Sequence, residues 1–133
     1  MITAVDSNIL IDVLGADARF GMASAKALRQ SKREGAICAC EIVWAEVATA
    51  YADEHIFVKA MKTLTLDFSP LTKPAALLAA RVWRTYRSAG GRRNRIAADF
   101  LIGAHALEQS DRLLTRDKGF YRKYFKELTV VTP

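Results

Sequence analysis

Short apolar runs alternate along the chain with longer stretches in which apolar residues recur every three or four positions. The first pattern is typical of buried strands and the second of amphipathic helices. Strands are therefore expected over residues 2–5, 36–39, 66–68, 112–115 and 128–131. Helices are expected after Asp6, over 21–34, 41–53, 55–65 and 97–109, and from Pro74 to Tyr86. This alternation predicts the α/β class, with a three-layer α/β/α fold around a central parallel sheet of about five strands.

The same pattern predicts helix faces and chain breaks. In the helix over 21–34, the apolar spacing places Met22 and Leu28 on the inner face. Adjacent glycines open a loop over 88–94, and a turn is expected over 116–119.

The chain is 133 residues long, which suits a single domain over residues 1–133. No apolar run reaches the roughly 18–20 residues of a membrane span. The first residues lack a basic region and reach a carboxylate at Asp6, which is unlike a signal peptide. Cys38 and Cys40 are too few for a disulfide framework. We therefore expect a cytoplasmic protein with no membrane association.

The balance of charge points to a polyanionic partner. Twenty Lys and Arg residues against fourteen Asp and Glu residues leave a net charge of +6, which by itself favours only non-specific attraction to nucleic acid. Basic residues cluster between Arg81 and Arg95 and again from Arg116 to Lys126. The candidates for RNA contacts are Arg92, Arg93, Arg95, Arg116 and Lys118. The alternative interpretation of these clusters is a solvated helix face.

Four carboxylates occupy positions where apolar residues are expected. Asp6 and Asp117 directly follow strands, while Glu46 and Asp99 share the apolar faces of their helices. Buried carboxylates are rare unless they are paired or bind a cation. A cluster of oxygen donors without His or Cys suits Mg²⁺ or Mn²⁺, and metal-activated water can hydrolyse a phosphodiester.

Each of these acids except Glu46 also has a purely structural interpretation. Asp6 can cap a helix, Asp99 can favour a helix dipole and Asp117 can belong to an ordinary turn. The neighbouring Ser7, Asn8 and Thr115 can orient a ligand or a water, or can simply form turns. The remaining acids are interpreted as surface or helix-cap residues: Asp12, Asp17, Asp53, Glu54 and Asp67.

These motifs resemble the PIN domain, and specifically the small VapC-type ribonuclease toxins of bacterial toxin–antitoxin pairs. The resemblance runs through Val5-Asp6-Ser7-Asn8-Ile9-Leu10-Ile11, Trp44-Ala45-Glu46-Val47, Ala98-Asp99-Phe100-Leu101-Ile102-Gly103-Ala104-His105-Ala106 and Leu113-Leu114-Thr115-Arg116-Asp117. It covers nearly the whole chain. One departure is Cys40, where relatives often carry Ser or Thr, and it predicts a weaker cap on the following helix.

The resemblance implies a five-stranded parallel sheet of the PIN type and endonucleolytic cleavage of RNA. It also implies that Asp6, Glu46, Asp99 and Asp117 bind one or two Mg²⁺ or Mn²⁺ ions, with Asp99 or Asp117 orienting the attacking water. A homodimer and a cognate antitoxin that occludes the site are further implications. The alternatives are a PIN-domain nuclease in RNA processing, or a catalytically silent PIN module that binds RNA or a partner. An aspartyl-phosphate phosphohydrolase is disfavoured, because Asn8 stands where its second Asp is needed.

Overall fold

The computed structural model describes residues 1–92 and 97–133. Its five strands are β1 (Ile2–Val5), β2 (Ala36–Ala39), β3 (Asp67–Phe68), β4 (Arg112–Leu114) and β5 (Val130–Val131). Its helices are α1 (Ser7–Leu14), α2 (Gly21–Glu34), α3 (Glu41–Ala48), α4 (Glu54–Thr63), α5 (Lys73–Ser88), α6 (Ala97–Gln109) and α7 (Lys118–Tyr124). Every pair of neighbouring strands is parallel, and the order across the sheet is β3-β2-β1-β4-β5.

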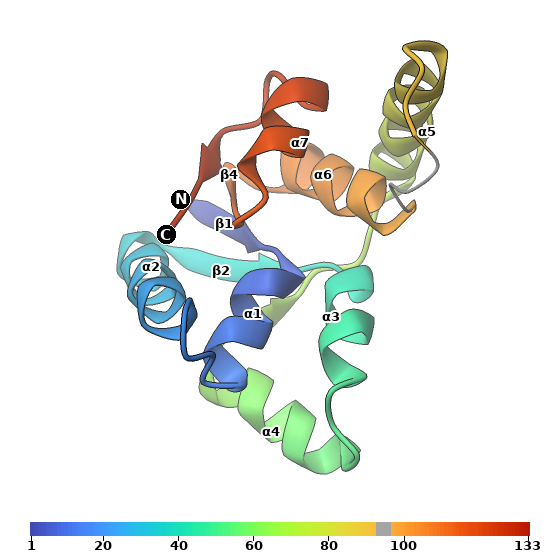
Figure 1. Ribbon diagram of the computed structural model, residues 1–133. Helices are drawn as coiled ribbons and strands as arrows, with labels where there is room; N and C mark the ends of the chain where they lie inside the picture. Colours follow the sequence, from blue (N-terminus) through green and yellow to red (C-terminus); the bar gives the residue numbers. More distant parts are fainter. Residues whose placement is uncertain (93–96) are drawn as a thin grey trace.

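The sheet lies between two layers of helices (Figure 1), with α1 to α4 on one side and α5 to α7 on the other. The expected α/β/α fold with a five-stranded parallel sheet is therefore confirmed. Among the described residues, none of the helices combines the length and apolar character needed to cross a membrane.

The order of the strands creates a switch point between β1 and β4. From β1 the chain builds the sheet toward β2 and β3, and from β4 it continues the other way to β5. The carboxyl ends of β1 and β4 are neighbours, because Val5 is paired with Leu114. In open α/β sheets, a crevice for ligands forms where the chain leaves two adjacent strands toward opposite faces. Asp6 follows one of these strands and Thr115 the other.

The core between α6 and its neighbours is tightly packed with aromatic rings. Trp83 stacks on Phe100 with 5.4 Å between ring centroids, and Phe100 makes an edge contact with Phe120 at 5.3 Å. Gly103 lies on the inner face of α6, where a Cβ atom would come within 2.5 Å of the Phe125 ring. This close approach lets α6 pack directly against Phe125, the residue that follows α7.

Several sequence predictions were wrong in detail. The helix expected over 41–53 ends at Ala48. Met22 is 89% exposed, whereas Leu28 is buried as expected. The inner face of α2 also carries Ser24, because small polar side chains allow the helix to pack closely on α1. The short helix α7 begins within the turn expected over 116–119 and was not predicted. Cys40, as expected, gives α3 no side-chain cap.

Candidate active site

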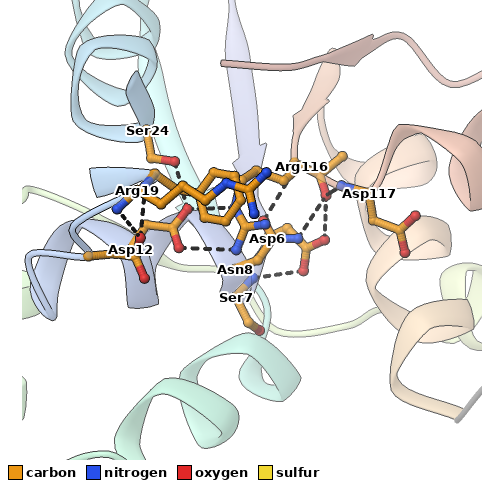
Figure 2. Close-up of polar contacts among 11 residues, drawn as sticks. Asp6, Ser7, Asn8, Asp12, Arg19, Ser24, Arg116 and Asp117 are labelled. Carbon is orange, nitrogen blue, oxygen red and sulfur yellow. Dashed lines mark hydrogen bonds and ion pairs between the residues drawn. The ribbon is translucent and has the colours of Figure 1, made fainter. Parts of the chain in front are cut away.

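Asp6 and Thr115 form the centre of the candidate site at the switch point. Asp6 caps α1 by accepting a hydrogen bond from the Ser7 amide at 2.7 Å, and its other oxygen accepts one from the Thr115 hydroxyl at 2.7 Å. Thr115 Oγ1 in turn accepts hydrogen bonds from the Asp117 amide at 3.0 Å and from Asn8 Nδ2 at 3.3 Å. One buried hydroxyl therefore links the ends of β1 and β4. Figure 2 shows the surrounding residues Asp6, Asn8 and Asp117.

Burial makes the ionised form of Asp6 unfavourable. The residue is 6% exposed, and desolvation raises the pKa of its carboxyl from the ordinary 3.8 to about 6, with a smaller contribution from the nearby charge of Asp99. The hydrogen bonds from Thr115 and Ser7 oppose this shift only in part. A cation bound here would relieve the penalty directly.

Glu46 joins the site through Ser7. The Ser7 hydroxyl donates a hydrogen bond of 2.6 Å to Glu46 Oε1, and the glutamate is half-buried on α3. Ser7 is the first residue of α1, so this contact ties the start of α1 to α3. Glu46 is thus partly shielded from solvent, and its role in the site stays a prediction.

Asp99 and Asp117 reach the site from the opposite layer of helices. Asp99 is half-buried in the first turn of α6, and it is near enough for its charge to raise the pKa of Asp6. Asp117 is half-buried at the N-cap position of α7, where its side chain does not cap the helix. Both acids therefore lie at the starts of helices and are only partly accessible to solvent.

Tyr121 is a residue of this site that the sequence analysis missed. Burial, and after it the charges of Asp6, Asp99 and Asp117, raise the pKa of its phenol. Its side chain is fully buried. The signal for it was available, because Tyr121 lies four residues after Asp117 and such residues share one face of a helix.

The donor chemistry of this site fits a hard divalent cation. The converging groups present oxygen atoms only, from carboxylates and hydroxyls, and these are the ligands that Mg²⁺ and Mn²⁺ prefer. In the part of the chain that the structure describes, no three His, Cys, Asp or Glu side chains form a ready-made ligand cluster. The residues therefore suit such an ion in kind, and their carboxylates must draw closer to hold it.

Asp12 corrects the sequence analysis. It was interpreted as a surface or cap acid, yet it is 2% exposed and forms an ion pair with Arg116 at 2.6 Å. Its burial follows from the packing of α2 on α1, which its neighbours in sequence do not reveal.

The basic residues expected to contact RNA have different surroundings. Arg92 and Lys118 are exposed, whereas the Arg116 guanidinium is paired with Asp12. Arg93 and Arg95 lie outside the described residues. Further exposed arginines lie along α5, namely Arg81, Arg84 and Arg87.

Comparison with known proteins adds the family. The sequence model of the PIN domain matches residues 3–126. VapBC2 from Rickettsia felis, solved bound to a DNA fragment from their promoter, is similar in structure, with a TM-score of 0.79 at 15% identity over 100% of this chain and 99% of that chain. VapBC-1 from nontypeable Haemophilus influenzae follows with 0.76 at 18% identity, over 99% and 98% of the two chains.

A third similar structure is a toxin-antitoxin complex from Klebsiella pneumoniae. It has a TM-score of 0.65 at 23% identity, over 98% of this chain and 97% of that one. At these identities the likeness concerns the fold. No curated protein matches the sequence.

Proposed function

Because the chain belongs to the PIN domain family, we propose that it is a metal-dependent endoribonuclease and the toxin of a VapBC-type toxin–antitoxin pair. The observation that carries this proposal is the buried Asp6 at the switch point, with its pKa raised to about 6 and with Asp99 close by. Holding a carboxylate in this state costs stability, and a site that binds a cation explains why it is kept.

Each acid has a role in this proposal. Asp6, Glu46, Asp99 and Asp117 hold Mg²⁺ or Mn²⁺, which when bound supplies a water of lowered pKa and polarises a phosphate oxygen. Asp99 or Asp117 orients the attacking water in line with the scissile bond. Hydrolysis then leaves a 5′-phosphate and a 3′-hydroxyl.

The polar neighbours keep these acids in place. Thr115 donates to Asp6 and receives the Asp117 amide, so it holds two of the acids relative to each other. Ser7 donates to Glu46 and thereby joins the third. Asn8 supports the same turn through its hydrogen bond to Thr115.

RNA is held by the basic residues around the acidic centre. Arg92, Arg93, Arg95 and Lys118 are proposed to bind the phosphates that flank the scissile bond, in keeping with the net charge of +6. Arg116 is the exception among the basic residues singled out from the sequence, because its guanidinium is already paired with Asp12.

The proposed partners follow from the similar structures. VapBC2 and VapBC-1 were each solved as VapBC assemblies, which supports a cognate antitoxin for this chain as well. A homodimer, a single domain over 1–133 and a cytoplasmic location belong to the same proposal.

Cleavage of a structured RNA tests the proposal. Bulk tRNA is incubated with the protein in Mg²⁺ or Mn²⁺ and, separately, in EDTA, alongside Asp99→Asn and the control Asp67→Asn. Asp67 is an exposed acid on the edge strand β3, so its replacement tests the loss of one negative charge away from the site. We expect cleavage by the wild type and the control with metal only.

The other results point elsewhere. Cleavage that persists in EDTA or in Asp99→Asn would contradict the proposed metal site. RNA binding without cleavage would favour the catalytically silent PIN module. The candidate antitoxin encoded by the neighbouring gene can be co-expressed with the protein. If metal-dependent cleavage is then unchanged, a nuclease of RNA processing is favoured.

A further inference from the structure

Arg116 stands between two residues of the candidate site, yet its side chain turns away from them. It reaches back to α1, where Nε lies 2.6 Å from Asp12 Oδ2 and Nη2 lies 3.1 Å from Asp12 Oδ1. Figure 2 shows this side chain extending toward Asp12 and away from Asp117. The carboxylate side chain is 3% exposed and the arginine side chain 32%, so the pair is shielded mainly on the aspartate side.

Two further contacts fix the pair in place. The Ser24 hydroxyl of α2 donates a hydrogen bond of 2.8 Å to Asp12 Oδ2. The Arg116 guanidinium lies over the Phe20 ring, 3.9 Å from its centroid. Charge, a two-pronged hydrogen bond and stacking therefore act together on one planar group, a combination that lysine does not reproduce.

The backbone at Arg116 links this ion pair to the candidate site through two amide hydrogen bonds. The Arg116 amide donates to Asn8 Oδ1 at 3.2 Å, and the next amide, that of Asp117, donates to Thr115 Oγ1 at 3.0 Å. That same Thr115 hydroxyl holds Asp6. A shift of the turn would thus displace both aspartates from each other.

We propose that Asp12 and Arg116 are positioning residues, whose ion pair fixes the turn that carries Thr115 and Asp117 against Asp6. This inference rests on the proposed nuclease function for its kinetic consequences, although the clamp itself is a property of the fold. It assigns Arg116 a role different from phosphate binding. The two roles make opposite predictions for lysine, which keeps the charge and loses the planar fork.

The kinetic test compares Arg116→Lys and Asp12→Asn with Arg112→Lys. Arg112 pairs with Glu34 at the opposite end of β4, so it is a matched loss of an arginine ion pair away from the site. With a single-site RNA substrate, we expect kcat to fall at least tenfold in both clamp variants, with KM unchanged and the control within twofold of the wild type. Wild-type kcat in Arg116→Lys would overturn the proposal.

A second measurement does not depend on nuclease activity. Amide hydrogen exchange by NMR, on the metal-free protein, reports the opening of the turn at Arg116 and Asp117. We expect exchange at these amides to be at least tenfold faster in Arg116→Lys, with no change in Arg112→Lys. Unchanged exchange would overturn the clamp, even if the wild type cleaves RNA.

The two measurements separate the two hypotheses. If amide exchange is faster in Arg116→Lys but the wild-type protein cleaves no RNA, the clamp is supported and the nuclease function is refuted. If Asp12→Asn fails to fold, Arg116→Lys alone decides, because it retains the positive charge opposite Asp12.

Discussion

Replacing Asp6 by Asn should stabilise the metal-free protein at neutral pH. In the folded chain, burial raises the pKa of this carboxyl from 3.8 to about 6. The unfolded chain therefore releases the proton first, and the wild type loses stability as the pH rises from about 4 to about 6. Below this window the carboxyl is neutral in both states, so Asp and Asn should then differ little.

The size of the effect follows from the pKa difference. One pKa unit corresponds to about 1.4 kcal/mol, so the rise to about 6 costs the wild type about 3 kcal/mol above pH 6. Asp6 accepts hydrogen bonds from both Ser7 and Thr115 through two oxygens, whereas Asn has only one. The weakened hydrogen bond costs the variant about 1 kcal/mol of stability. The net gain of about 2 kcal/mol should raise Tm by about 6 °C at pH 7.

Thermal melting in EDTA at pH 4, 5, 6, 7 and 8 measures this difference. Asp17→Asn is a control of opposite sign, because the amides of Phe20 and Arg19 lower the pKa of Asp17. Its carboxylate stabilises the fold above the ordinary pKa, and that contribution is lost as the pH falls, so this variant should melt below the wild type at pH 7. A gap between Asp6→Asn and the wild type that is the same at pH 4 and pH 8 would refute the reasoning.

Two further predictions concern the metal and the core. Mn²⁺ should raise the Tm of the wild type more at pH 7 than at pH 5, because protons compete for Asp6 below a pKa of about 6. Melting with and without Mn²⁺ measures the rise, and an equal rise in Asp99→Asn would contradict metal binding by Asp99. Gly103→Ala should cost about 1–3 kcal/mol in urea unfolding, since its Cβ would come within 2.5 Å of Phe125. Gly119→Ala, where a Cβ meets nothing within 4 Å, should not be destabilised.

The fold class could be predicted from local sequence patterns, and the same patterns singled out the four acids as candidates. Parallel strands buried on both faces are apolar, so β1 and β2 were visible as apolar runs. The edge strand β3 is exposed and carries Asp67, so its signal was weaker. Asp6 follows the first such run and Asp117 closely follows the fourth. Because the carboxyl ends of parallel strands share one edge, the convergence of these two acids followed from local pattern and topology.

Predictions from local sequence patterns were wrong where packing against neighbouring elements determined which residues are buried or where a helix ends. Met22 has the spacing of an inner residue, yet it is 89% exposed, because α2 approaches α1 through its small residues. The chain over 41–53 has helical periodicity to its end, but the helix stops at Ala48. Periodicity describes one element, and it does not show which side another element will cover.

The surroundings of Asp12 and Arg116 depend on packing between distant elements. These residues are 104 positions apart in the chain, and no local property of either one predicts the pair. Asp12 becomes buried because α2 packs over it, and a buried carboxylate must then find a partner charge. The same long-range packing buries Tyr121, whose pKa is raised by burial and by the charges of Asp6, Asp99 and Asp117. The residue types thus indicate the chemistry of the candidate site. Its geometry depends on contacts between elements that only the folded chain brings together.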